Sequence, residues 1–125
     1  MKPGEGSVKR KILIAEDDKA LQMFYREELE EDGYEVCIVN DGQEALTRLD
    51  EERFDLVLLD IVMPVMDGIA VLERMKAQNG KIPVILHTSH PKYADDPRSS
   101  LADAFIIKSG DLIDLKTKIK SLLGN

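Results

Sequence analysis

Asp55-Leu-Val-Leu-Leu-Asp60-Ile-Val-Met-Pro64-Val-Met-Asp67-Gly68 contains the most apolar run of this chain, and that run ends on a carboxylate. Four consecutive apolar residues, 56–59, predict a short strand that is buried on both faces, as the strands of parallel sheets are. Pro64, Asp67 and Gly68 indicate a loop, and the apolar spacing that follows predicts a helix with Met75 on its inner face. This stretch and the residues that follow it are therefore predicted to form a strand, an acidic loop and a helix.

The same alternation continues on both sides of this unit. Further strands are expected at residues 12–15, 34–39, 82–88 and 105–107. Further helices are expected over residues 19–32, around 45–49 and around 112–122. Five strands alternating with helices predict an α/β fold, with a doubly wound parallel sheet, right-handed crossovers and helices on both faces.

The segment between the last two expected strands is the weakest part of this pattern. Pro91 and Pro97 interrupt it, together with the paired Asp95 and Asp96. A proline is tolerated in the first turn of a helix but not in its interior, so we expect at most about two helical turns after Pro97.

Composition limits the class of protein. The chain has 125 residues, with 17 Lys and Arg against 24 Asp and Glu, which gives a net charge of −7. This length suits one domain, expected over residues 10–125 after a flexible lead-in at 1–9. The acidic balance argues against binding nucleic acid or an anionic membrane, so protein or cationic partners are expected. A single cysteine and the absence of a long apolar run favour a cytoplasmic protein without an intramolecular disulfide.

Chemically useful side chains follow several of the expected strands. Ligands of open parallel sheets bind beyond the carboxyl ends of the strands, where the strand order reverses. The residues expected at that edge are Glu16, Asp17, Asp60, Thr88, Ser89 and Lys108. Separate parts of the chain thus bring carboxylates, hydroxyls and an ammonium group together.

This set has the parts that phosphoryl transfer needs. Crowded carboxylates repel one another unless a cation offsets their charge, and an all-oxygen set favours Mg²⁺. Lys108 and the Thr88 hydroxyl can neutralise and orient a phosphoryl group, and catalysis of its transfer consists mostly of positioning and charge neutralisation. Asp60 is then the candidate nucleophile, forming an acyl phosphate.

Each residue also has a simpler interpretation when taken alone. Acidic residues after a strand commonly cap a helix, a role that Asp18 can fill here, and a lone Asp at a strand end is usually a turn residue. Four such residues at one edge are hard to explain in this way. His87 and His90 could suggest zinc, but their spacing places them on opposite faces of a strand, with no third soft ligand nearby.

These motifs resemble the receiver domain of bacterial two-component response regulators. The segment 55–68 is similar to the phosphorylation-site signature of that family almost throughout. The blocks Ile12-Leu-Ile-Ala-Glu-Asp-Asp18, Ile82-Pro-Val-Ile-Leu-His-Thr88-Ser89 and Phe105-Ile-Ile-Lys108 match in the same order. The resemblance covers residues 10–123 and implies the flavodoxin-like strand order 2-1-3-4-5.

The resemblance also implies a mechanism. Asp60 would accept a phosphoryl group from the phosphohistidine of a sensor histidine kinase or phosphotransfer protein. Asp17, Asp60 and the main-chain oxygen of Val62 would bind Mg²⁺, with Glu16 acting mainly through water, and Lys108 would pair with the phosphoryl oxygens.

The expected response is a packing switch rather than classical enzymatic turnover. Thr88 would move toward the phosphoryl group, and Phe105 would turn inward. The surface of the fourth helix, fifth strand and last helix would change for a downstream protein or a homodimer. The domain would assist only its own phosphorylation and autodephosphorylation.

Three departures from the family pattern lie on the surface that is expected to change on phosphorylation, rather than at the acidic pocket. Ser109 replaces the usual proline after the lysine, which is often preceded by a cis peptide, so a trans bond is expected here. Phe105 replaces the commoner tyrosine, and the segment from Thr88 to Lys108 is about two residues shorter than usual. We therefore expect the chemistry to be retained and the signalling surface to be unusual.

Two other functions remain open. The first is a protein-interaction module that works without phosphorylation on the same fold, which the altered segment after Thr88 favours and the complete acidic set opposes. The second is a flavin-binding electron carrier, because flavodoxins share the architecture. The Glu-Asp-Asp sequence at 16–18 is unlike the hydroxyl- and glycine-rich phosphate loop of those proteins, so this function ranks last.

Overall fold

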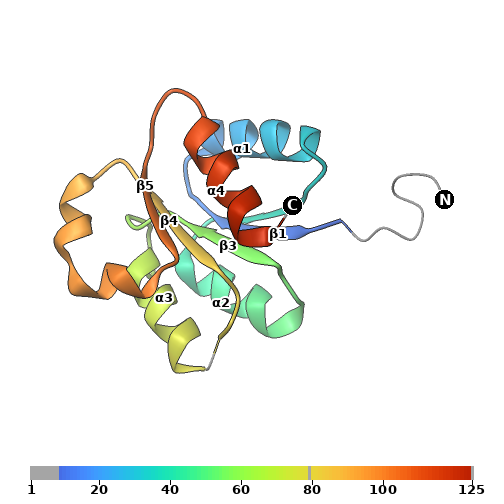
Figure 1. Ribbon diagram of the computed structural model, residues 1–125. Helices are drawn as coiled ribbons and strands as arrows, with labels where there is room; N and C mark the ends of the chain where they lie inside the picture. Colours follow the sequence, from blue (N-terminus) through green and yellow to red (C-terminus); the bar gives the residue numbers. More distant parts are fainter. Residues whose placement is uncertain (1–8, 79, 125) are drawn as a thin grey trace.

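Strand β3 (Leu56–Leu59) lies at the centre of a five-stranded parallel sheet, and all four of its residues are buried. The computed structural model describes residues 9–78 and 80–124. The strand order is β2-β1-β3-β4-β5, which confirms the predicted topology (Figure 1). The other strands are β1 (Lys11–Ala15), β2 (Glu35–Val39), β4 (Val84–Thr88) and β5 (Ala104–Ile107).

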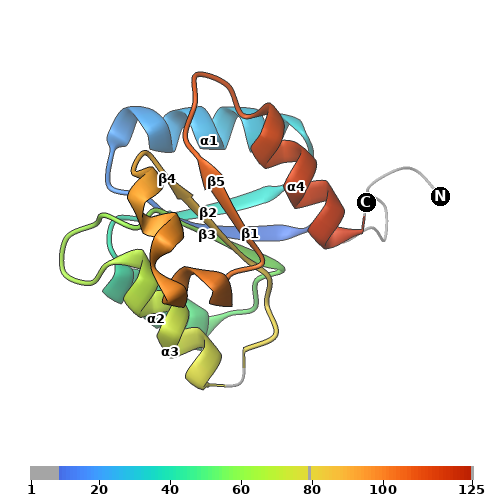
Figure 2. The same ribbon diagram turned by 60° about the vertical axis from the view of Figure 1, so that its left-hand side comes forward.

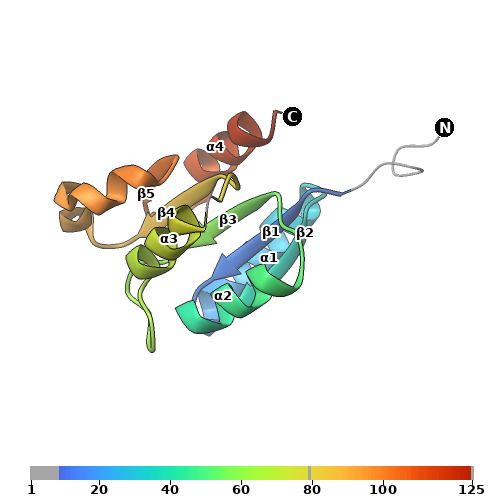
Figure 3. The same ribbon diagram turned by 90° about the horizontal axis from the view of Figure 1, so that it is seen from below.

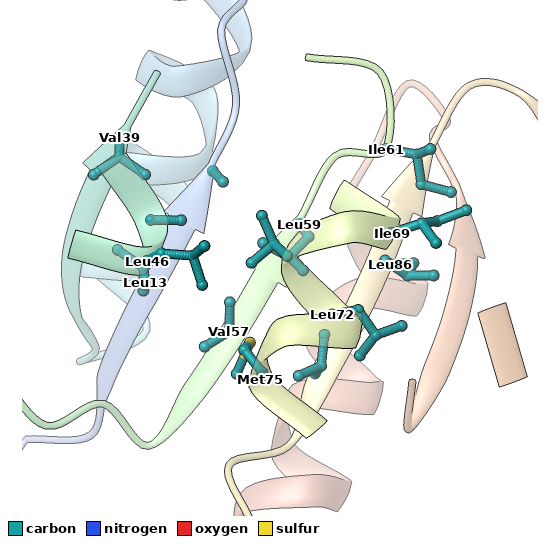
Figure 4. Close-up of a cluster of buried hydrophobic side chains, with 14 of the residues drawn as sticks. Leu13, Val39, Leu46, Val57, Leu59, Ile61, Ile69, Leu72, Met75 and Leu86 are labelled. Atoms are coloured by element: carbon teal, nitrogen blue, oxygen red, sulfur yellow. The ribbon is translucent and has the colours of Figure 1, made fainter. Parts of the chain in front are cut away.

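Two pairs of helices cover the sheet, one pair on each face. Helices α1 (Lys19–Glu31) and α4 (Ile113–Leu123) lie on one face, and α2 (Gly42–Glu51) and α3 (Gly68–Ala77) lie on the other (Figures 1 and 3). Alternate residues of each central strand therefore enter different apolar layers. On the α2–α3 side, one apolar cluster includes Leu13, Val57, Leu72, Met75 and Leu86 (Figure 4). The doubly wound arrangement is as predicted.

Aspartates cap three of the four α-helices in residues 9–78 and 80–124. The side chains of Asp18, Asp41 and Asp67 each accept a hydrogen bond from a backbone N–H three residues further on. Such caps satisfy donors that have no partner inside the helix. The predicted capping role of Asp18 is confirmed, which leaves Glu16 and Asp17 available for other interactions.

The segment between β4 and β5 differs from the prediction. No α-helix forms there; two 3₁₀-helices take its place, η1 (Pro91–Asp95) and η2 (Pro97–Leu101), with η2 beside α3 (Figure 2). Each begins at a proline, so neither can extend the other into one longer helix. Asp96 caps η2 by accepting from the Arg98 backbone N–H. The short helical segment expected after Pro97 is present, but as a 3₁₀-helix rather than an α-helix.

Smaller differences concern the ends of elements and the terminus. Strand β4 begins at Val84 rather than at residue 82, because the preceding Pro83 has no N–H to donate to a sheet. Residues 1–8 of the predicted lead-in lie outside the described residues. None of the helices that the structure describes has the length and apolar character needed to span a bilayer.

Gly68 makes the closest backbone approach at the site edge of the sheet. A Cβ atom at this position would overlap the main-chain oxygen of Asp60, and the Gly68 N–H donates to the Ile61 carbonyl oxygen at 2.9 Å. Helix α3 can therefore begin directly against the end of β3 only if this residue has no side chain.

Gly68→Ala should lower the free energy of unfolding by about 2 kcal/mol, because the added methyl group forces α3 away from the end of β3. Urea denaturation of the parent and the variant measures this. Gly110→Ala is the matched control, since a Cβ there meets nothing within 4 Å. Equal losses in the two variants would contradict the close-approach explanation.

Candidate functional site

The carboxyl ends of four strands bring the predicted residues to one edge of the sheet. Glu16 follows β1, Asp60 follows β3, Thr88 ends β4 and Lys108 follows β5. They line or adjoin a pocket of about 310 Å³. Its lining residues are Glu16, Asp17, Asp18, Asp60, Val62, Ser89, His90 and Lys108.

The ammonium group of Lys108 joins the carboxylates. Its Nζ lies 2.7 Å from Glu16 Oε1 and 3.3 Å from Asp60 Oδ2, and the lysine side chain is only 15% exposed. The Lys108 backbone N–H donates to the Thr88 carbonyl oxygen at 2.8 Å, which holds the start of this loop on β4. The described residues contain no cis peptide bond, so the bond between Lys108 and Ser109 is trans, as expected.

Glu16 is the inward member of the acidic pair. Its side chain is 2% exposed, and Oε2 accepts from the Asp18 backbone N–H at 3.1 Å. Burial raises the pKa of Glu16, while the hydrogen bond from Lys108 opposes the rise. Asp17, the next residue, faces solvent. The loop after β1 thus presents one carboxylate that is held by protein groups and one that is free to take a ligand.

The carboxylates are spaced to hold one cation. Oxygen atoms of Glu16, Asp17 and Asp60 all lie within 4.8 Å of one another. Ligands on opposite sides of one Mg²⁺ ion lie about 4.2 Å apart, since each Mg–O bond is about 2.1 Å, so small side-chain rotations suffice. A donor set made only of oxygen suits Mg²⁺ better than a softer metal. Val62 also lines this pocket.

The two residues predicted to form the switch lie close to the site. Thr88 is fully buried, and its Oγ1 accepts from the His90 backbone N–H at 3.1 Å. Phe105 is opposite Leu86 in the β4–β5 ladder, half-buried, and packs against the apolar layer on the α2–α3 side. Their movement on phosphorylation stays a prediction.

A buried polar pair, Tyr25 and His87, lies beside the site and was not predicted from the sequence. The Tyr25 hydroxyl lies 2.5 Å from His87 Nδ1, and the two side chains are 1% and 2% exposed. Burial, and then the carboxylates of Glu16 and Asp60, raise the pKa of Tyr25. Burial, and then the charge of Lys108, lower the pKa of His87 to about 4. Both groups are therefore neutral at pH 7.

The sequence indicates that Tyr25 and His87 are each buried, but it does not indicate that they meet. Tyr25 falls on the inner stripe of α1, and a histidine inside a buried strand must find a hydrogen-bond partner. That the two meet depends on how α1 crosses the sheet, and they are 62 residues apart. The His-x-x-His pattern does not form a metal site, because His87 is buried against Tyr25 whereas His90 is exposed.

Comparison with known proteins gives one consistent family. The family model described as "Response regulator receiver domain" matches residues 12–120. The chain is 32% identical over 121 residues to the transcriptional regulatory protein PrrA of Mycobacterium tuberculosis, covering 94% of this chain and 52% of that protein. It is 28% identical to PhoP, the alkaline phosphatase synthesis regulator of Bacillus subtilis, covering 91% of this chain and 48% of that protein. The chain thus spans about half the length of these curated relatives.

Solved structures agree with the sequence relatives. Response regulator TrrA of Thermotoga maritima, crystallised in complex with Mg²⁺ and BeF, superposes with a TM-score of 0.88 at 35% identity. This match covers 91% of this chain and 99% of the TrrA chain. TrrA in complex with the histidine kinase ThkA gives a TM-score of 0.85, also at 35% identity, with 91% of this chain and 98% of that chain covered.

The buried His87 should make stability depend on pH. Its folded-state pKa of about 4 lies below the ordinary value of 6.5, so the unfolded chain binds the proton more tightly. The associated stability is complete above pH 6.5 and is lost as the pH falls toward 4, by about 3 kcal/mol. Urea denaturation between pH 7 and pH 4.5 measures the loss.

His87→Leu should remove this part of the pH dependence, whereas His90→Leu, which removes an exposed imidazole nearby, should keep the parent's profile. Carboxylates titrate in the same range in all three proteins, so the difference between profiles isolates His87. A His87→Leu profile parallel to that of the parent would show that His87 is not buried in its neutral form.

Proposed function

Because this chain belongs to the family of response regulator receiver domains, we propose that it is a phosphoacceptor switch in which Asp60 takes a phosphoryl group from a phosphohistidine. One observation carries the proposal. The Asp60 carboxylate lies in a polar pocket, 3.3 Å from the Lys108 ammonium and beside two further carboxylates that can hold Mg²⁺ with it.

The pocket geometry supports attack by Asp60. Its carboxylate is 9% exposed, so a donor reaches it only through the opening of the pocket. A carboxylate oxygen forms the new bond to phosphorus, the P–N bond of the donor breaks, and its electron pair stays with the donor imidazole. Mg²⁺, held by Glu16, Asp17, Asp60 and the main-chain oxygen of Val62, would offset the added negative charge. Glu16 would act mainly through water.

Lys108 supplies the charge compensation that belongs to the chain itself. In the structure its ammonium bridges Glu16 and Asp60. A phosphoryl group on Asp60 adds negative charge within reach of the same ammonium, so Lys108 can pair with the phosphoryl oxygens by a small rotation. The Thr88 hydroxyl, now bonded to the His90 N–H, is the second candidate donor.

The output is a change of surface rather than release of a product. Movement of Thr88 toward the phosphoryl group would open space that Phe105 can fill from β5. The surface that responds then comprises η2, β5 and α4, since two 3₁₀-helices, and not an α-helix, connect β4 to β5. The domain assists only its own phosphorylation and hydrolysis.

The partners follow from this chemistry. The donor is a sensor histidine kinase or a phosphotransfer protein, which the complex of TrrA with ThkA supports. A downstream protein or a second copy of the domain would read the altered surface, and no nucleic acid or membrane contact is involved. A cytoplasmic location suits such a donor.

A second candidate function is protein binding that does not depend on phosphorylation. The connection between β4 and β5 favours this function. It consists of η1 and η2 instead of an α-helix, so the surface that a partner would read differs from the pattern of the family. The intact set of Glu16, Asp17, Asp60 and Lys108 favours the switch.

Incubation with acetyl phosphate and Mg²⁺ should add one phosphoryl group, measured as intact mass. Asp60→Asn and added EDTA should each abolish the increment, and Asp95→Asn, which alters an exposed carboxylate on η1, should leave it unchanged. If the protein accepts a phosphoryl group only from its kinase, it should still bind beryllofluoride. A parent protein that neither gains mass nor binds beryllofluoride would leave the interaction module as the better function.

Asp17→Asn should stabilise the metal-free protein by about 0.5–1 kcal/mol, because it removes one of three mutually repelling carboxylates. The same variant should lose most of the rise in melting temperature that the parent shows with Mg²⁺. Glu51→Gln makes the same change in net charge at an exposed position of α2. Thermal melts of the three proteins with and without Mg²⁺ test both parts, and a metal-free Asp17→Asn protein that melts well below the parent would contradict the first.

A further inference from the structure

The Tyr25–His87 pair lies in an otherwise apolar layer. Its surroundings on the α1–α4 side include Ile14, Leu29 and Ile85. Replacing both partners of such a buried hydrogen bond by apolar groups of similar shape is often close to neutral for stability, whereas removing one partner is costly. Stability alone therefore gives little reason for a polar pair at this place.

The pair connects the two halves of the candidate site. On one side is α1, which starts directly at the acidic loop: Asp18 caps it, and the Gln22 side-chain amide donates to the Glu16 carbonyl oxygen. The position of α1 therefore decides where the acidic loop lies. On the other side, His87 precedes Thr88 on β4.

Another link between these parts in the described residues passes through Lys108, whose ammonium pairs with Glu16 and whose backbone N–H donates to the Thr88 carbonyl oxygen. Strands β1 and β4 do not pair, because β3 lies between them. The sheet thus couples the loop after β1 to Thr88 only through the β3 ladders. The hydrogen bond from Tyr25 to His87 passes from α1 directly to β4.

The pair is also within the electric field of the pocket. The carboxylates of Glu16 and Asp60 act on the Tyr25 hydroxyl, and the Lys108 ammonium acts on the His87 ring. The phenol and the imidazole are both neutral, and they share one hydrogen bond whose donor is set by the tautomer of His87. New charge in the pocket therefore acts on this bond.

We propose that Tyr25 and His87 are positioning residues for the phosphoacceptor site. Their hydrogen bond holds α1, and the acidic loop at its start, in a fixed position relative to Thr88 on β4. This inference rests on the proposed function of Asp60. Neither residue touches the reacting atoms, so the effect is on the rate of phosphorylation and on the affinity for a phosphoryl analogue.

The test compares Tyr25→Phe, His87→Leu and the double variant with the parent. Each single variant should lose stability, because one buried polar group remains without its partner. The double variant should regain most of that stability, because both polar groups are gone. All three should phosphorylate with acetyl phosphate about three- to tenfold more slowly and bind beryllofluoride correspondingly more weakly, which is the size expected from one hydrogen bond.

Tyr34→Phe is the matched control. Tyr34 is buried in the same apolar layer, next to the amino end of β2 and away from the pocket, so its loss should leave the phosphorylation rate unchanged. In the parent protein, the His87 ring ¹⁵N resonances should shift when beryllofluoride binds with Mg²⁺. The shift should be reduced in Tyr25→Phe.

The decisive comparison is the stable double variant. If it regains stability and also phosphorylates at the parent's rate, the pair is only structural and the proposal is wrong. If the double variant fails to fold, Tyr25→Phe with an unchanged rate and an unchanged beryllofluoride affinity has the same meaning. A parent that takes neither phosphoryl group nor beryllofluoride instead disproves the proposed function, and this inference with it.

Discussion

The charge balance around Lys108 is the interaction on which the rest of this site depends. Parallel pairing of five strands brings Glu16 and Asp60 to one edge of the sheet, and Glu16 is almost completely buried. Buried carboxylates without a compensating charge are costly, and the Lys108 ammonium reaches both of them. Under the proposed function, the same ammonium would pair with a phosphoryl group on Asp60. The charge balance of the site, and the proposed response to phosphorylation, therefore depend on one side chain.

Local backbone devices keep this arrangement in place. Gly68 allows α3 to begin against the Asp60 carbonyl, and Asp18 and Asp67 cap the helices that follow the acidic loops. The loops after β1 and β3 are therefore anchored where the following helices begin. Beneath them, Tyr25 and His87 add a polar contact between α1 and β4. The site is held by helix starts on one side and by buried side chains on the other.

The output side is where this chain departs from the expected pattern. Two prolines separate the β4–β5 connection into η1 and η2, and Ser109 follows the lysine with a trans bond. None of these features alters the carboxylates, because they lie after β4 and β5 rather than after β1 and β3. The acidic pocket can thus be retained while the surface that a partner would read differs.

The sequence by itself determined the sheet, its layers and most of the site. Apolar runs such as 56–59 report burial on both faces, and in a parallel sheet every strand end points to the same edge, so the order of strands and polar residues along the chain is enough to place Glu16, Asp60, Thr88 and Lys108 together. Only the tertiary structure decided which groups touch. That Lys108 bridges Glu16 and Asp60, and that Tyr25 meets His87, depend on crossing angles and packing between distant elements. The apolar periodicity of the sequence does not predict these contacts, because it indicates which face of an element is buried and not which residues pack against that face.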